Sequence, residues 1–336
     1  MIMKFDYCIG NPPYQENTEG EGNFKYAPPT FHTFMDAAYD IADKVEMITP
    51  AKFLFNAGNT PKAWNEKMLN DEHLKVEYYT RDCSTVFSNV NFAGGVAITY
   101  RDATKNFGAI KHFMEYSEMN NILQKVWSKS SVDTLCTVID VCTKFDLKNL
   151  EADYPEYKGH ERRLSSNILT FDCFHNDDDG NSIGIYGVIK NQRSFKYINK
   201  KYIDNDAKID TYKVLIPKSG GDGSFGETIS NPIVATPNTG YTHTFIGIGN
   251  FNTRIEAENT LSYISTKFVR ALLSVLKVTQ DFTSEKWAYV PLQDFTSNSD
   301  IDWNKSISDI DKQLYQKYDL SDDEIDFIET HVKEMM

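Results

Sequence analysis

Hydrophobic residues in the first hundred positions fall into short runs separated by amphipathic segments, a pattern typical of strands that alternate with helices. The runs around residues 5–9, 45–49, 74–79 and 96–100 predict strands. Helical spacing of the apolar positions predicts helices over 31–42 and 60–69, the second with Thr60 as N-cap and Pro61 at its first position. Pro50 ends the second strand, so that residues 48–55 form a strand, a turn and a helix start.

The hydrophobic pattern changes after Tyr100. A linker and a helix over 118–129 are followed by short strands with glycine- and asparagine-rich connections, which predict a mixed domain with much β-structure. The expected strands are 182–189, 196–203, 212–217, 232–236 and 243–249. Residues 256–277 predict one long amphipathic helix, and residues 321–335 a last helix with Ser321 and Glu324 as a capping box.

The composition fits a globular protein of two domains. The chain has 336 residues, of which 40% are hydrophobic, and this length exceeds one typical domain. No apolar run reaches the length of a membrane span, and no signal pattern opens the chain, so we expect a soluble, cytoplasmic protein. The five cysteines have no paired spacing and predict reduced thiols, and the histidine spacings predict no metal site.

The stretch from Lys4 to Tyr14 carries the most specific chemical signal. Pro12 and Pro13 hold the residues before them in extended conformations, at the carboxyl end of the first predicted strand. The carboxamide oxygen of Asn11 and the carbonyl of Pro12 can accept both hydrogens of an exocyclic amine, while Tyr14 stacks on its ring. The alternative is an ordinary proline turn in which Tyr14 belongs to the core.

The tetrapeptide Asn11-Pro12-Pro13-Tyr14 resembles the catalytic motif of amino-methyltransferases that use S-adenosylmethionine, chiefly the N6-adenine DNA methyltransferases. Glutamine N5- and RNA guanine N2-methyltransferases have similar motifs. Residues 48–55, the Asn70-Asp71 turn, 86–100 and 268–295 resemble Eco57I-type restriction-modification methylases more specifically. The resemblance implies an α/β fold: a partial Rossmann-like methyltransferase sheet over 1–110, followed by a mixed α+β target-recognition domain over 111–336.

This resemblance assigns further roles. Phe87 covers the face of a flipped adenine opposite Tyr14, unless it is a hydrophobic plug; Asn89 and Asn91 are expected to form turns. Residues 15–30 form a loop that orders over the base or stays on the surface. In the second domain, basic residues interleaved with aromatic ones predict contacts to double-stranded DNA, although solvated strand faces look alike. The candidates are Lys190, Arg193, Lys196 and Lys218.

The methyl donor has no recognisable site. The glycine-rich strand-turn-helix of methyltransferases is missing, and the one alternative is the string Phe245 to Gly249, as a permuted donor loop. The resemblance therefore implies either an N-terminal donor-binding partner chain or a truncated relative with impaired donor binding. The net charge of −13 opposes DNA binding, but recognition needs only a local basic face.

Other functions stay open on these observations. A methyltransferase acting on protein or RNA would share the tetrapeptide, but would not need a second domain of this size. A non-catalytic DNA-binding specificity module would bind DNA and show no affinity for the donor. A restriction subunit is a third alternative, although the sequence holds no convincing nuclease motif.

Overall fold

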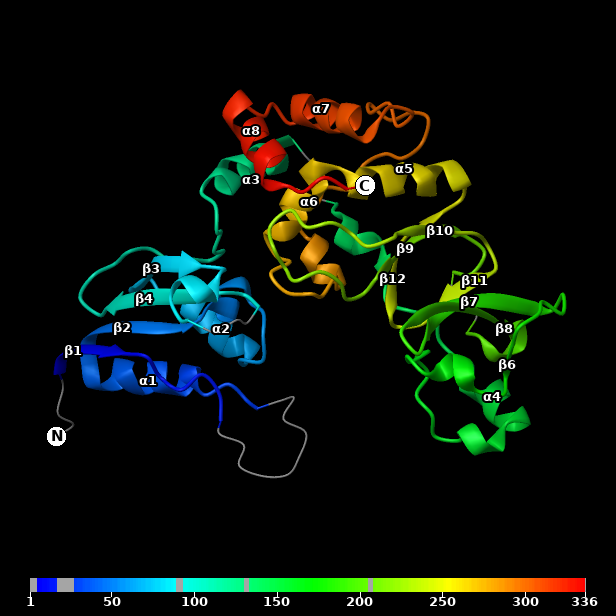
Figure 1. Ribbon diagram of the computed structural model, residues 1–336, viewed down its shortest axis with the longest axis horizontal. Coiled ribbons are helices and arrows are strands. Elements are labelled where there is room, and N and C mark those ends of the chain that lie inside the picture. The colour runs from blue at the N-terminus through cyan, green and yellow to red at the C-terminus, as the bar shows by residue number, and fades with distance from the viewer. Residues whose placement is uncertain (1–4, 17–26, 89–92, 130–132, 205–207, 336) are drawn as a thin grey trace. The chain divides into compact units, whose positions relative to one another are not determined.

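The chain folds into two compact units. The computed structural model describes residues 5–16, 27–88, 93–129, 133–204 and 208–335. The first unit consists of residues 1–117 with 222–224, and the second of residues 118–221 with 225–336 (Figure 1). Both units combine helices with sheets, which confirms the expected mixture of the two.

The first unit is a four-stranded sheet with helices that follow its first strand. Its elements are β1 Phe5–Gly10, α1 Phe31–Ile41, β2 Ala42–Pro50, α2 Lys62–Leu69, β3 Leu74–Thr80 and β4 Val96–Asp102. The strand order is β1-β2-β4-β3. β1 and β2 are parallel, whereas β4 is antiparallel to both of its neighbours. The predicted strands and helices of this region are confirmed within a few residues at their ends.

Helix α1 covers one face of this sheet because its apolar residues recur at helical spacing. Met35 and Ala38 on α1 are buried, as are Val45 and Met47 on β2, and Figure 1 shows α1 running alongside β1 and β2. On the opposite face, alternate residues of the edge strand β1 are exposed, up to 73% at Ile9. The sheet is therefore packed on one side, while the outer strand keeps an apolar surface in contact with solvent.

The start of α2 differs from the prediction. Pro61, and not Thr60, is the N-cap residue of α2, and no side chain caps this helix. The hydroxyl of Thr60 instead donates a 2.7 Å hydrogen bond to the side-chain oxygen of Asn65. The Thr60 hydroxyl thus bonds the buried side chain of Asn65, and not the helix backbone as the sequence pattern predicted.

The second unit holds two further four-stranded sheets and six helices among its described residues. The strand orders are β10-β9-β12-β5 and β11-β7-β8-β6. The strands are β5 Ile139–Asp140, β6 Phe174–His175, β7 Ser182–Ile189, β8 Gln192–Asn199, β9 Tyr212–Pro217, β10 Ile233–Ala235, β11 Thr239–Tyr241 and β12 Phe245–Phe251. The helices are α3 Glu118–Lys129, α4 Leu147–Asp153, α5 Arg254–Ser265, α6 Lys267–Ser274, α7 Ile307–Lys317 and α8 Asp322–His331.

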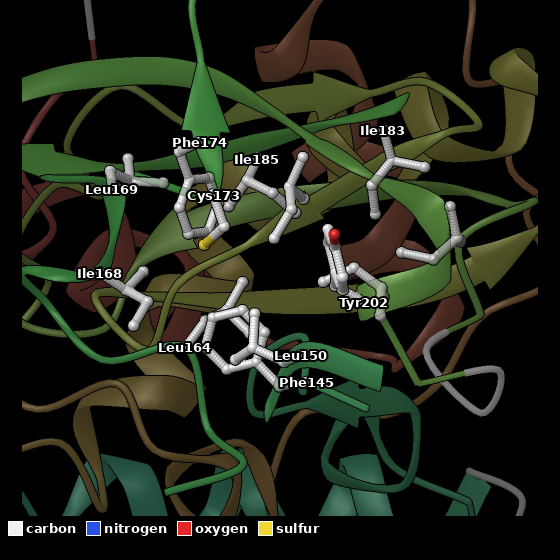
Figure 2. Close-up of a cluster of buried hydrophobic side chains, with 13 residues drawn as sticks. Phe145, Leu150, Leu164, Ile168, Leu169, Cys173, Phe174, Ile183, Ile185 and Tyr202 are labelled. Atoms are coloured by element: carbon white, nitrogen blue, oxygen red, sulfur yellow. The ribbon is translucent and has the colours of Figure 1, made fainter. Parts of the chain in front are cut away.

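The β7–β8 hairpin anchors one core of this unit. Lys190 and Asn191 both have positive φ, 49° and 63°, as a two-residue type I′ turn requires. Behind the hairpin, Ile183, Ile185 and other apolar residues form a buried cluster with residues from α4 and the following loops (Figure 2). The cluster comprises Phe145, Leu150, Leu164, Ile168, Leu169, Cys173, Phe174, Ile183, Ile185, Ile198, Tyr202, Ile203 and Ile209.

The single helix predicted over 256–277 is wrong: the structure has two helices, α5 and α6, separated by Thr266. Thr266 is extended, with φ −64° and ψ 152°, and its hydroxyl accepts the Val269 N–H as the N-cap of α6. The carboxylate of Asp311 accepts two more N–H groups at the start of α6, those of Lys267 and Phe268. Every residue of α6 is buried, so this helix has no solvent-exposed face.

The sequence pattern did not predict several short elements. Helices α4 and α7 and strands β5, β6 and β11 were not predicted, and the strand expected over 196–203 ends at Asn199, where a 3₁₀ turn, Lys200–Tyr202, follows. The expectations for Asn89 and Asn91, and for most of the loop over 15–30, fall on residues outside the described part of the chain.

Other structural expectations concern the cysteines, metals and membranes. All five cysteines are free thiols, and Cys83 and Cys173 are buried. The described residues include no group of three or more His, Cys, Asp or Glu side chains placed to hold a metal ion. Within the same residues, every helix is too short or too polar to span a lipid bilayer.

The capping box of α8 provides a stability test. The Ser321 hydroxyl accepts the Glu324 N–H, and the Glu324 carboxylate accepts the Ser321 N–H. We expect Ser321→Ala to lower the free energy of unfolding of the second unit by about 1 kcal/mol, because a helix N–H loses its acceptor. Urea unfolding followed by circular dichroism measures the loss. Ser308→Ala, at an exposed position inside α7, is the control and should leave stability unchanged; equal losses would contradict the assignment.

Candidate functional site

The four residues Asn11 to Tyr14 form a corner at the carboxyl end of β1. Asn11 and Pro13 are exposed, Pro12 is buried and Tyr14 is half-buried. β2 is parallel to β1, so its own carboxyl end, at Pro50, lies at the same edge of the sheet. This edge is where open α/β sheets bind ligands.

Thr30 holds this corner in place. Its hydroxyl donates a 2.9 Å hydrogen bond to the carbonyl of Pro13, and its N–H donates to the carbonyl of Tyr14 at 3.2 Å. Thr30 is also the N-cap residue of α1, yet its side chain makes no cap hydrogen bond to that helix. The hydroxyl that would ordinarily stabilise the helix instead fixes the loop next to it.

The polar groups at the tip of the corner are available to a ligand. Within the described residues, no hydrogen bond reaches the carboxamide of Asn11 or the carbonyl of Pro12. The carbonyl of Pro13, by contrast, is occupied by Thr30. Two oxygen acceptors, one from a side chain and one from the backbone, therefore remain for two donor hydrogens.

The rings of Tyr14 and Phe87 are in contact. Their centroids are 6.3 Å apart and the ring planes meet at 71°, an edge-to-face arrangement. A 3₁₀ turn, Cys83–Thr85, positions Phe87, whose N–H donates to the Cys83 carbonyl at 2.8 Å. The structure thus brings together the two aromatic residues that the sequence placed on either side of a base.

Burial raises the pKa of the Tyr14 phenol to about 12, and the neighbouring Cys83 thiol adds a smaller effect in the same direction. The phenol therefore keeps its proton at physiological pH. A neutral ring without charge repulsion suits stacking on an uncharged base better than a phenolate would.

Tyr14 lines a cavity of about 470 Å³ in the first unit. This volume lies within the range of ordinary small-molecule sites, roughly 300–1,000 Å³. Asn11, Pro12 and Pro13 are not part of its wall. The wall comprises Tyr14, Gln15, Ala27, Pro29, Phe31, Pro50, Lys52, Ala57, Gly58, Asn59 and Thr60.

Tyr14 and Phe87 stand too close to hold a base between them. Two parallel rings need about 7 Å between their planes to admit a third, since aromatic carbons touch at roughly 3.5 Å. The edge-to-face contact leaves no such gap. A base could therefore lie between the two rings only after Phe87 moves away from Tyr14, and Phe87 is not part of the wall of the cavity that Tyr14 lines.

Arg193 and Lys218 lie together in the second unit, at a cleft of about 410 Å³ that also includes His243 and Asp281. The Arg193 guanidinium already donates to the carbonyls of Ser230 and Asn231 and lies over the Phe245 ring. No described residue makes a hydrogen bond or ion pair with the Lys218 ammonium. Arg193 is thus fixed by the fold, whereas Lys218 can bind a partner.

Lys190 and Lys196 occupy different positions from these two. Lys190 is exposed in the β7–β8 turn. Because side chains alternate along a strand, Lys196 projects from the opposite side of β8 to Arg193. Lys196 pairs in register with Ile185, and its ammonium is hydrogen-bonded to Asn176. The four basic candidates do not form one continuous group.

The string Phe245 to Gly249 lies in strand β12, which pairs with β9 and β5. A Cβ atom at Gly247 or Gly249 would overlap the ring of Tyr241 or Phe251, respectively. Because aromatic rings fill the space above both glycines, the string has neither the turn nor the open backbone that a donor loop requires. The permuted donor loop is not supported.

Two contributors to this region were missed by sequence reasoning. Thr30 was assigned only to a loop, and Lys52 only to a helix start, because neither carries a motif of its own. The Pro-Pro-Thr sequence before α1 was the one available signal for Thr30, since a threonine after prolines at a helix start is a plausible cap.

Comparison with known proteins shows which proteins the segment around this site resembles. Residues 1–87 match the family model described as Eco57I restriction-modification methylase, which confirms the resemblance over that segment. A protein of Mycoplasma pneumoniae described as an uncharacterized adenine-specific methylase is 25% identical over 176 residues, which cover 47% of this chain and 42% of that protein.

A solved structure, the type IIL restriction-modification enzyme MmeI in complex with DNA, overlaps 97% of this chain and 56% of its own, with a TM-score of 0.42 and 10% identity. That overlap is too loose to define a common fold. The matched regions span about half the length of both relatives.

The Thr30 contacts can be tested without any ligand. Thr30→Val keeps the side-chain shape but removes the hydrogen bond to Pro13, so we expect amide hydrogen exchange of residues 11–16 to accelerate severalfold because local opening becomes easier. Hydrogen-exchange mass spectrometry measures this change. Thr30→Ser keeps the hydroxyl and should retain the slow exchange. Indistinguishable exchange in Thr30→Val and the unaltered chain would show that this hydrogen bond does not hold the corner.

Proposed function

We propose that this chain contributes the catalytic corner and the target-recognition part of a DNA methyltransferase that modifies the N6 atom of adenine, as part of a restriction-modification system. The observation that carries the proposal is the corner itself. Asn11 and Pro12 present free acceptors beside a neutral Tyr14 ring and a cavity, at the ligand-binding edge of a parallel strand pair.

The strand arrangement supports a Rossmann-like origin for the first unit. Two parallel strands followed by an antiparallel hairpin, in the order β1-β2-β4-β3, correspond to the second half of a methyltransferase sheet. In such a sheet the corner after β1 lies next to the reacting atoms. The family match over residues 1–87 covers this corner, and the relative described as adenine-specific supports adenine as the substrate.

The chemistry assigned to this chain concerns the acceptor base. An adenine leaves the duplex at a cost of a few kcal/mol and stacks on Tyr14. The Asn11 carboxamide oxygen and the Pro12 carbonyl accept the two amino hydrogens. Because these acceptors draw the hydrogens out of the ring plane, the nitrogen lone pair is withdrawn from the ring and becomes nucleophilic. The donor would supply a methyl group from its sulfonium, so that the carbon–sulfur bond breaks and the neutral thioether leaves as the nitrogen–carbon bond forms, and water takes the surplus proton from the nitrogen.

S-adenosylmethionine is the donor that this chemistry requires, but the described residues of this chain do not fit it. The glycine string in β12, which is the one string that the sequence offered as a donor loop, is filled by aromatic rings. We therefore assign the donor site to another polypeptide segment, such as a partner methyltransferase chain. The strand β1 supports such an association, because Phe5, Tyr7 and Ile9 expose an apolar row on a strand that lies at the edge of its sheet among the described residues.

A methyl-transfer assay tests the proposal. Labelled S-adenosylmethionine and mixed-sequence DNA are incubated with this chain alone and with the product of the gene directly upstream, and digested DNA is analysed for N6-methyladenine. We expect Asn11→Ala to lower transfer on the order of a hundredfold, because the amine loses an acceptor that acts in the transition state.

The exposed residue Asn120 on α3 supplies a matched control, and Asn120→Ala should transfer normally. Transfer that is unaffected by Asn11→Ala would remove Asn11 from the mechanism. Methylation of RNA or protein, but not DNA, would reject the substrate. DNA binding without donor affinity in every combination would indicate a specificity module.

Lys218 provides a separate test of DNA binding. We expect Lys218→Ala to weaken binding to mixed-sequence duplex DNA and to reduce the salt slope of the association constant by about 1, because one phosphate contact is lost. Fluorescence anisotropy across a range of salt concentrations measures both quantities. Lys196→Ala should change the slope less, since Asn176 already engages that ammonium. A larger slope change for Lys196→Ala would reverse these assignments.

A further inference from the structure

Among the described residues that line the cavity beside Tyr14, Lys52 has the one charged side chain. The other lining residues are aromatic, aliphatic, amide- or hydroxyl-bearing, or glycine. Lys52 is half-buried, so its ammonium can be solvated by water, or can bind a carboxylate of the protein or an anion that enters the cavity.

The described part of the protein supplies no carboxylate partner for Lys52. Among the described residues, no carboxylate lies within 4.0 Å of the Lys52 ammonium, and no hydrogen bond from it is formed. Two other lysines with restricted exposure have carboxylate partners: Lys267 contacts Glu329, and Lys125 contacts Glu324. Lys52 therefore keeps its full capacity to bind an anion.

Two glycines hold the aliphatic part of Lys52. A Cβ atom at Gly94 would overlap the Lys52 Cγ atom, and one at Gly58 would lie 3.1 Å from its Cβ. Both glycines have positive φ, 90° and 86°. Because larger residues at either position would displace the side chain, the backbone forms a slot that directs Lys52 along the cavity wall. Less side-chain entropy is then lost when the ammonium binds a ligand.

Lys52 begins close to the corner in the sheet. It follows Pro50 at the carboxyl end of β2, and β2 is hydrogen-bonded to β1, which ends at the corner. An anion bound by Lys52 therefore lies in the same cavity as a ring that stacks on Tyr14. A nucleotide has this combination of a flat base and a phosphate one sugar away.

We propose that Lys52 binds the phosphate of the nucleotide whose base stacks on Tyr14, and so anchors the extruded nucleotide in the cavity. This inference rests on the proposed function. Lysine suits this role because its compact ammonium binds phosphate as a point charge. The carboxylate of a methyl donor is the other anion that the same ammonium could bind, and the experiment below separates the two.

The test measures binding of 2′-deoxyadenosine, its 5′- and 3′-monophosphates and S-adenosylmethionine to the full chain by NMR titration. We expect the unaltered chain to bind one monophosphate roughly tenfold more tightly than the nucleoside, since a charge-assisted contact is added. Lys52→Met should abolish this preference while leaving nucleoside affinity unchanged. Lys52→Arg should retain it, and Lys62→Met, at an exposed lysine outside the cavity wall, should have no effect.

Each remaining outcome overturns the inference in a distinguishable way. If nucleoside binding depends on Tyr14 but the phosphate adds nothing, the phosphate contact is rejected while the proposed function stands. If Lys52→Met weakens only S-adenosylmethionine, the ammonium binds the donor carboxylate instead. If neither nucleoside nor monophosphate binds, the base cavity and the proposed function fail together with the role of Lys52.

Discussion

The pair of hydrogen bonds from Thr30 to Pro13 and Tyr14 is the constraint on which the candidate site depends. Two prolines stiffen the corner, but stiffness alone does not fix its direction. Thr30 starts α1, and α1 packs on β2, so these bonds connect the corner to the rigid body of the sheet. The uncapped start of α1 is the cost, about 1 kcal/mol of helix stability. The fold thus exchanges helix stability for a fixed position of Tyr14.

In the proposed mechanism, the stacking of a base on Tyr14 supplies only part of the binding free energy. Stacking of a base on an aromatic side chain contributes about 1–3 kcal/mol. Extrusion of the base from a duplex costs a few kcal/mol, which is of the same size, so stacking alone leaves little net binding. The proposed hydrogen bonds of Asn11 and Pro12 and the proposed phosphate contact of Lys52 supply the remainder.

The sequence predicted correctly several elements that depend only on residues close together in the chain. The strands Ser182–Ile189 and Tyr212–Pro217 and the helix Glu118–Lys129 follow from runs of apolar residues bounded by turn formers. Thr266 broke a predicted helix because its partners come from elsewhere: Asp311, 45 residues later in the chain, accepts the N–H groups that begin α6. The site divides in the same way. Asn11 to Tyr14 carry a contiguous motif, but the roles of Thr30 and Lys52 arise only from tertiary contacts.

The net negative charge of the chain limits how it could bind DNA in the proposed function. With a net charge of −13, long-range attraction to a polyanion is absent, so binding depends on contacts within about 8–10 Å, the screening length at physiological salt. Lysines such as Lys125 and Lys267 are neutralised by glutamates, whereas Lys52 and Lys218 stand at cavities without a carboxylate partner within the described residues. The proposed function therefore implies weak non-specific association with DNA under these conditions. Affinity then comes mainly from short-range contacts that depend on local geometry, which favours selectivity over tight binding.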